Sequence, residues 1–321
     1  MSCIICFETP RDQLIAPLAA YSIDGPHNWP VLAPLIAIVG PTAAGKSAFA
    51  LALAARLPGA VIVAADSRQV YRGLDIGTAK PTPQEQAQTP HRLIDVVDPD
   101  QPFTLADYQR LAYEAIDAAA KPLLVGGTGL YLRAVVDGFT LPPAPPDAAL
   151  RRAGLGRGQL LDRLRQLDPT TAEAIDAANP YRLLRAVERA GADIPPPQPR
   201  YQVLQLGLSA PRQELYRRAD ERVERLLAAG WLDEVRRLAA RYPPELPALT
   251  GLGYAELARQ LRGELTLNEA AAAIKRRTRQ FIKRQQTWFR RDPRIHWFDV
   301  TQPGWQAQAI EAVGTVWRLK Y

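Results

Sequence analysis

The segment GPTAAGKS (40–47) restricts the fold of this chain more than any other feature of its sequence. It matches G-x-x-x-x-G-K-[ST], a pattern in which glycines let backbone N–H groups turn toward phosphate oxygens. The apolar run LIAIV (35–39) predicts a buried strand before it, and SAFALALAARL (47–57) predicts a helix after it. The positive end of such a helix points at a bound anion. The predicted phosphate-binding loop consists of Gly40, Pro41, Thr42, Ala43, Ala44, Gly45, Lys46 and Ser47.

Within this loop, Lys46 supplies a positive charge and Ser47 a hydroxyl that can bind a Mg²⁺ ion bridging two phosphates. Asp66 ends a second apolar run, AVIVAAD (60–66). A carboxylate there is typical of ATP-binding proteins that hold Mg²⁺ through water, and it can equally cap the next turn. An ATPase has no evident need for the polar, glycine-containing segment ADSRQVYRGLDIGTAKP (65–81) that follows, so both interpretations leave it unexplained.

Apolar and amphipathic segments alternate along most of the chain. Further strands are predicted at 91–97, 122–126 and 201–208, and helices at 104–120, 127–139, 211–241, 252–262 and 267–291. This alternation predicts an α/β fold with a parallel sheet covered by helices on both faces. In such sheets ligands bind beyond the carboxyl ends of the strands, where the phosphate loop, Asp66 and Thr128 all fall.

Two proline-rich segments, LPPAPPD (141–147) and ADIPPPQPR (192–200), interrupt the chain. We expect a helical insertion between them, followed by the return of the chain to the core. The predicted division is a disordered leader (1–34), the first part of the core (35–145), the insertion (146–200), the second part of the core with basic helices (201–300) and a C-terminal tail (301–321).

Composition favours a protein of the cytoplasm. No apolar run reaches about 18 residues, so no membrane span is expected, and the N-terminus lacks the pattern of a secretory signal. The only two cysteines, Cys3 and Cys6, have no second Cys/His pair to complete a zinc site. Without a disulfide framework, a reducing compartment is expected.

The net charge of +7 is concentrated near the C-terminus. Residues 275–291 include eight lysines and arginines and no acidic residue. Ile274, Phe281 and Trp288 recur every seven residues and predict the face turned toward the core. Because solvated helix faces usually mix charge signs, this positive face favours a track for an RNA backbone.

Several segments, in this order, closely resemble the bacterial tRNA dimethylallyltransferases, also called isopentenyl-diphosphate:tRNA transferases or IPP transferases. The resemblance extends from residue 35 to about 299. The segments are GPTAAGKS, DSRQVYRGLDIGTAKP, HRLIDVVDP, PLLVGGTGLYLRAVVDG, LDPTTAEAI, NPYRLLRAVE, RADERVERLLAAGWLDEV, LTGLGYAEL and RRTRQFIKRQQTWFRR.

This resemblance implies transfer of a dimethylallyl group from dimethylallyl diphosphate to N6 of adenosine 37, next to the anticodon, in tRNAs that read codons starting with U. It implies Asp66 as the proton acceptor, Thr128 as a second catalytic residue, and Arg222 with the loop as diphosphate ligands. Mg²⁺ would be bound by Ser47 or Thr42, and the enzyme would be monomeric. The implied tRNA contacts are Asp66, Ser67, Arg68, Gln69, Thr128, Arg151, Tyr181, Arg182, Leu183, Leu184, Arg185, Arg277 and Arg284.

Three other functions share the phosphate loop. An adenylate isopentenyltransferase would perform the same chemistry on free AMP, but would need neither the insertion nor the basic helix. A small-molecule kinase would add an arginine-bearing lid over its nucleotide. A non-catalytic RNA-binding NTPase would bind RNA in a nucleotide-dependent way and form no covalent product.

Overall fold

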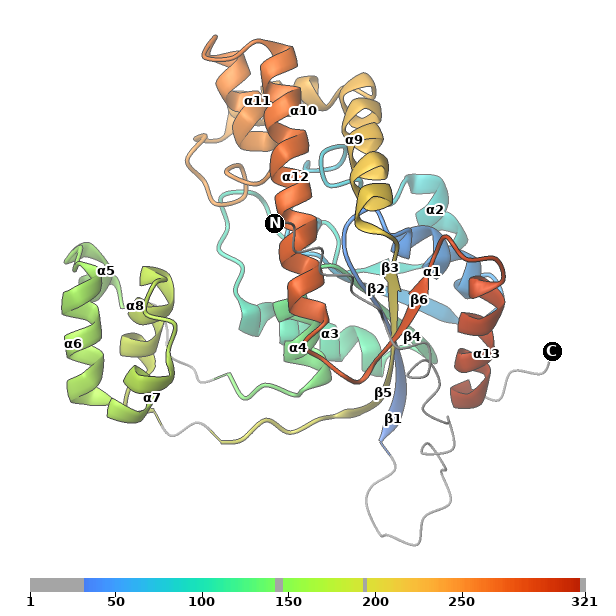
Figure 1. The fold of residues 1–321 in the computed structure, drawn as a ribbon, viewed down its shortest axis with the longest axis horizontal. Coiled ribbons are helices and arrows are strands. Elements are labelled where there is room, and N and C mark those ends of the chain that lie inside the picture. The colour runs from blue at the N-terminus through green and yellow to red at the C-terminus, as the bar shows by residue number, and fades with distance from the viewer. Residues whose placement is uncertain (1–31, 142–146, 193–194, 318–321) are drawn as a thin grey trace, which may run out of the picture.

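The computed structural model describes residues 32–141, 147–192 and 195–317. Its centre is a six-stranded sheet with the order β3-β2-β4-β1-β5-β6, in which every pairing is parallel (Figure 1). The predicted α/β fold is therefore confirmed. The predicted leader lies outside the described residues up to position 31, and Ala33 already belongs to β1. The strands are β1 Ala33–Val39, β2 Ala60–Ala65, β3 His91–Arg92, β4 Lys121–Gly126, β5 Tyr201–Ser209 and β6 Ile295–Asp299.

Both faces of the sheet are covered, which explains why the central strands are apolar without alternation. In β1, Ile36 and Ile38 face one core, and Leu35 and Val39 face the other. The first core is shared with α1 (Lys46–Ala54), α9 (Arg212–Ala228) and α13 (Trp305–Trp317). The second is shared with α3 (Leu105–Asp117), α4 (Gly129–Val136) and the end of α12 (Leu267–Phe289).

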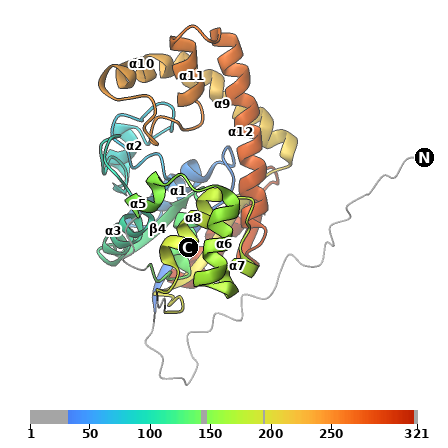
Figure 2. The ribbon, with the colours of Figure 1, turned by 90° about the vertical axis from the view of Figure 1, so that its left-hand side faces the viewer.

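A helical layer stands beyond the carboxyl ends of the strands (Figures 1 and 2). It consists of α9, α10 (Trp231–Arg241), α11 (Tyr254–Leu261) and α12, and its core is built around Trp231. The single helix predicted at 211–241 is wrong. The chain breaks at Gly230, where φ is 96°, a left-handed conformation that glycine adopts without a steric penalty.

The insertion contains α5 (Ala148–Arg152), α6 (Arg157–Leu167), α7 (Pro169–Ala174) and α8 (Pro180–Arg189). It stands to one side of the sheet (Figure 1) and has its own apolar core, which includes Leu160, Leu164 and Leu183. Its two connections to the sheet core run together where the Gln198 amide donates to the Gly138 carbonyl, at 2.9 Å.

Three further elements differ from the predictions. The strand predicted at 91–97 is only two residues long, because Leu93 and Asp95 have φ values of 63° and 53°. Strand β6 was not predicted. The segment predicted as a tail contains α13, which packs on the sheet through Ala309 and Val313.

The short helix α2 (Pro83–Gln88) begins with a capping box between Thr82 and Glu85. Within the described part of the chain, no helix has the length and apolar character required to cross a membrane.

Candidate active site

A cavity of about 400 Å³ lies where the strand ends meet the helical layer. The phosphate loop, the ends of β2 and β4, and helices α9, α11 and α12 contribute to its wall. Of the predicted site residues it includes Thr42, Lys46, Ser47, Asp66, Ser67, Arg68, Gln69, Thr128, Arg222, Arg277 and Arg284. The sheet topology therefore brings together residues that are far apart in the sequence.

Two glycines of the predicted phosphate loop occupy positions that disfavour a side chain. Gly45 has a φ of 85°, and a Cβ on Gly40 would lie 2.2 Å from the Leu208 carbonyl oxygen, so that position requires glycine. Lys46 Nζ donates to the Pro41 carbonyl at 2.8 Å. Burial, together with the nearby charge of Arg222, lowers the pKa of Lys46 to about 7, although the charge of Asp66 opposes the shift.

Asp66 is fixed by the turn that follows it. Its Oδ1 accepts hydrogen bonds from the backbone amides of Arg68 at 2.8 Å and Gln69 at 3.4 Å. In the described residues no hydrogen bond to Oδ2 is formed, so this oxygen is available to a group in the cavity. The Thr128 hydroxyl oxygen accepts from the Ser67 amide at 3.1 Å, and the Thr128 amide donates to Ala65 O, which ties the ends of β2 and β4 together.

Arg222 points from α9 into the cavity. Its Nη2 donates to the Thr78 carbonyl at 3.3 Å, and Gln69 Nε2 donates to the same carbonyl at 3.2 Å. Burial lowers the pKa of Arg222, which the charge of Asp66 partly offsets. The acidic residues beside it in α9 bind other partners: Glu221 binds Arg217 and Glu224 binds Lys275, both at 2.6 Å.

Gln285 of α12 occupies a position that the sequence analysis missed. It is 5% exposed; its Oε1 accepts from the Thr42 amide at 2.8 Å, and its Nε2 donates to Gly127 O at 2.9 Å. This side chain therefore joins the phosphate loop to the turn that carries Thr128. The sequence did contain an indication that Gln285 is buried. Residues 278, 282, 285 and 289 are spaced by three or four positions, which places them on one face of the helix.

Helix α12 also corrects the predicted buried face. Ile274 is buried, but Phe281 and Trp288 are only partly buried and line cavities. The basic face is partly neutralised by residues of α9 and α11. The ion pairs are Lys275–Glu224 at 2.6 Å, Arg279–Asp220 at 3.0 Å, and Arg277–Glu256.

Other basic side chains, in the last turns of α12 and just after its end, face solvent. Lys283 and Arg291 form no ion pair with any described residue, and Arg284 lies over the Phe281 ring at 5.7 Å. Lys283, Arg284 and Arg291 surround a shallow pocket with Trp288. This part of the helix keeps the uncompensated positive charge that the sequence predicted.

The predicted contact residues of the insertion do not line the cavity. Tyr181 is 78% exposed on α8, and Leu184 is partly buried. Arg151 and Arg185 both bind Glu188, at 2.8 and 3.0 Å. Arg182 binds Asp176 at 3.1 Å. Leu183 requires a correction: it is fully buried in the core of the insertion, so its side chain cannot contact RNA.

Comparisons with known proteins agree on one family. The model of the family described as IPP transferase matches residues 69–292, and that described as isopentenyl transferase matches residues 33–96. The tRNA dimethylallyltransferase of Symbiobacterium thermophilum is 46% identical over 90% of this chain and 96% of its own length. That of Moorella thermoacetica is 48% identical over 83% of this chain and 90% of its own.

A solved structure agrees with these sequence matches. The tRNA isopentenylpyrophosphate transferase of Bacillus halodurans is 37% identical and superposes with a TM-score of 0.68, covering 89% of this chain and 97% of its own. Sequence, fold and the arrangement of the cavity thus lead to one conclusion: the chain belongs to the IPP transferase family.

Proposed function

We propose that this protein is a tRNA dimethylallyltransferase, which transfers the five-carbon group of dimethylallyl diphosphate to N6 of adenosine 37. The observation that carries the proposal is a single cavity in which a phosphate loop, the carboxylate of Asp66 and a basic helix meet. The names of the relatives support tRNA rather than a free nucleotide as the acceptor.

In the proposed reaction, the N6 lone pair attacks C1 of the allylic group while the bond from C1 to the diphosphate oxygen breaks. Nitrogen becomes positive and gives up its proton. Asp66 Oδ2 is available to accept this proton, while Oδ1 is held by the turn amides. The diphosphate that leaves would be stabilised by Lys46, the loop amides and Arg222, which are positioned before charge develops.

Mg²⁺ is the proposed cofactor. The Thr42 and Ser47 hydroxyls line the cavity, and such a small set of oxygen donors suits Mg²⁺, which retains waters and binds substrate phosphates. When bound, the ion would neutralise part of the diphosphate charge. Among the described residues no cluster of three His, Cys, Asp or Glu side chains could hold a metal by itself, which favours an ion that arrives with its phosphate ligand.

The anticodon stem-loop is the proposed partner. Lys283 of α12 and Arg291 just after its end, which form no ion pair with a described residue, would contact its phosphates, and the exposed Tyr181 would reach it from the insertion. The target base must leave its stack to enter the cavity, which costs least in a single-stranded loop. Action as a monomer in the cytoplasm stays a prediction from the sequence.

The test combines purified protein, Mg²⁺, labelled dimethylallyl diphosphate and bacterial tRNA that lacks the modification, with AMP and ATP as alternative substrates. Label recovered as N6-prenylated adenosine from digested tRNA is the expected result. Label on AMP would assign the chain to the free-nucleotide branch. Hydrolysis of ATP without prenyl transfer would leave the phosphate loop correctly identified and refute the reaction.

A further inference from the structure

One end of the cavity is apolar. Beyond Arg222, helix α9 lines it with Ala219, Val223 and Leu226, which recur on one face of the helix. Leu252 contributes to the same wall. If the diphosphate occupies the loop, the hydrocarbon attached to it has this apolar wall within reach.

The indole of Trp231 closes this end. Trp231 is 1% exposed, and behind it lies the apolar core of the helical layer, which includes Leu74 and Val235. Two glycines make room for the ring. A Cβ on Gly77 would lie 2.0 Å from indole Nε1, and a Cβ on Gly253 would lie 2.0 Å from Cη2.

The position of the indole is fixed by the carboxylate of Glu234, one helical turn later. Glu234 is 2% exposed and accepts backbone hydrogen bonds from Asp75 at 3.0 Å, Ile76 at 2.6 Å and Gly77 at 3.1 Å. It also accepts the Tyr254 hydroxyl at 2.7 Å, and the Tyr254 ring packs edge-on against the indole. The backbone of residues 75–77 and the Tyr254 ring both pack beside the indole, and both are hydrogen-bonded to this one buried carboxylate. The indole therefore cannot move aside without breaking these hydrogen bonds.

We propose that Trp231 sets the size limit of the transferred group and restricts the enzyme to five-carbon allylic diphosphates. This inference rests on the proposed function and identifies a residue that determines the specificity of that reaction. A ten-carbon chain attached to a diphosphate in the loop would need the space that the indole fills. The reaction itself would be unchanged: the bond from C1 to the diphosphate oxygen breaks and the bond from N6 to C1 forms.

The experiment compares dimethylallyl diphosphate with geranyl diphosphate, its ten-carbon homologue, on the same tRNA. The product is identified by the mass of the nucleoside after digestion. Trp231→Ala is expected to raise the kcat/KM for the ten-carbon donor relative to the five-carbon donor by at least about tenfold, since one to two methylenes already discriminate at that level. Trp297→Ala, in β6 and outside the cavity wall, is the matched control and should leave the ratio unchanged.

Leu226→Ala provides a second variant in case removal of the buried indole prevents folding. Leu226 is partly exposed on the same wall, and its truncation should shift the ratio in the same direction. The inference is overturned if the unaltered protein uses both donors equally. It is also overturned if the variants that fold and still transfer five carbons keep the original ratio. A protein that transfers no five-carbon group to tRNA would refute the proposed function itself, and the inference with it.

Discussion

Asp66 combines two tasks within one carboxylate. Oδ1 holds the turn that presents the Ser67 amide to Thr128, and Oδ2 accepts no hydrogen bond from the described residues. Removal of the whole side chain would therefore disturb the turn as well as the proposed chemistry. An isosteric change separates the two effects.

Replacement of Asp66 by Asn keeps an oxygen that can accept the Arg68 and Gln69 amides, but removes the proton acceptor. We expect tRNA binding to persist and kcat to fall by about 10²–10⁴-fold. Single-turnover rates and tRNA affinity measured on the same preparation check this result. Asp100→Asn, on an exposed loop, is the control. Normal turnover in Asp66→Asn would exclude Asp66 as the base.

The buried Lys46 makes diphosphate binding depend on pH. Its pKa is about 7 because burial and Arg222 disfavour the cation. At pH 8 the free protein carries mostly neutral Lys46, and an arriving anion favours the charged form. Binding of diphosphate at pH 8 should therefore be accompanied by uptake of about one proton by Lys46, and binding at pH 6 by much less.

Calorimetry in buffers of different ionisation enthalpy measures this uptake, with inorganic diphosphate as the probe and EDTA present to exclude metal. The proton uptake of diphosphate itself is subtracted with Lys46→Met. Equal uptake by the two proteins at pH 8 would contradict the lowered pKa.

At the scale of elements, helix α12 divides its basic residues into two groups. Lys275, Arg277 and Arg279, up to the middle of the helix, bind acidic residues of α9 and α11 and so tie these helices together. Lys283 in its last turns and Arg291 just after its end face solvent around Trp288. In the second group no described acidic residue compensates the charge, which leaves it available to an RNA backbone.

Lys283→Gln and Arg291→Gln should each weaken tRNA binding. Each should also flatten the dependence of log K on log salt by roughly one unit, the effect of one lost phosphate contact. Arg279→Gln is the matched control, because its charge is already compensated by Asp220 at 3.0 Å. Filter binding across a salt series gives the slopes. If all three variants show the same slope, this part of the helix does not contact the RNA backbone.

The sequence predicted the central elements well, since β1, β2, β4 and β5 contribute apolar residues to the cores on both faces of the sheet. Strand β6 escaped because IHWFD lies at the sheet edge and is mostly half-buried, which weakens its apolar pattern. β3 was overestimated because tertiary contacts bend the chain after it: Leu93 enters the core and Asp95 binds Lys80 at 2.5 Å.

The site was predictable to the extent that short motifs carry chemistry. The phosphate loop, Asp66 and Thr128 stand out by residue type and position. Gln285 and Trp231 do not stand out in this way. The hydrogen-bond partners of Gln285 lie more than a hundred residues away in the sequence. The space for the Trp231 indole depends on two glycines that pack against it.

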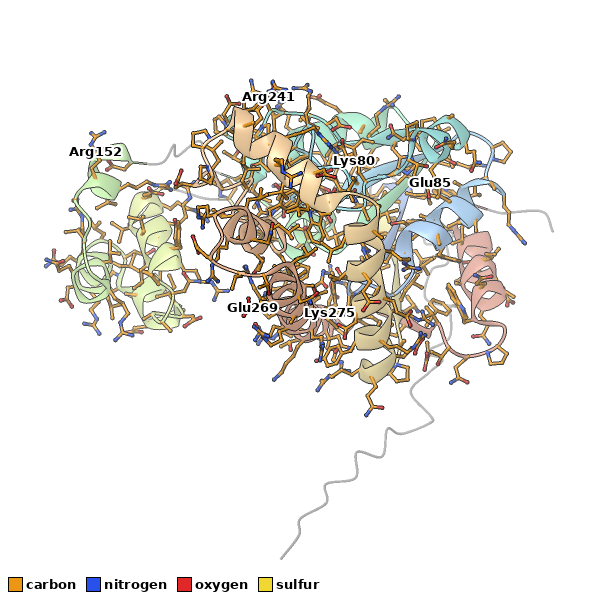
Figure 3. All side chains as sticks on the ribbon, turned by 90° about the horizontal axis from the view of Figure 1, so that it is seen from above. Lys80, Glu85, Arg152, Arg241, Glu269 and Lys275 are labelled. Carbon is orange, nitrogen blue, oxygen red and sulfur yellow. The ribbon has the colours of Figure 1, made fainter. Side chains whose placement is uncertain are left out.

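At the scale of the whole molecule, the insertion is a separate helical unit with its own core, beside the sheet (Figures 1 and 3). Arg152 marks it in Figure 3, apart from Lys275 on α12. The connections meet at Gly138 and Gln198, and the Thr140 hydroxyl donates to the Pro196 carbonyl at 3.2 Å. The two connections could therefore be joined at this point, in place of the insertion, without distorting the core.

A variant in which a short Gly-Ser linker replaces residues 142–195 should fold and bind diphosphate as the full chain does. Its tRNA affinity should fall by about tenfold or more, equivalent to about 1.4 kcal/mol. Thermal unfolding and the two binding constants are the measurements. The intact chain with Tyr181→Ala and Arg182→Ala tests the insertion surface alone. Loss of diphosphate binding after the excision would show that the insertion supports the sheet core.

The strand order has a further consequence while the chain is being made on the ribosome. β1 lies in the middle of the sheet, yet its neighbour β5 is translated only after the whole insertion. Until β5 emerges, the nascent chain carries an apolar strand with one open edge, the kind of surface that pairs wrongly with other chains. The insertion, whose core is its own, can fold during this interval. Pairing between strands that are far apart in the sequence forms slowly. We therefore expect chaperones to matter most for this protein before β5 pairs with β1.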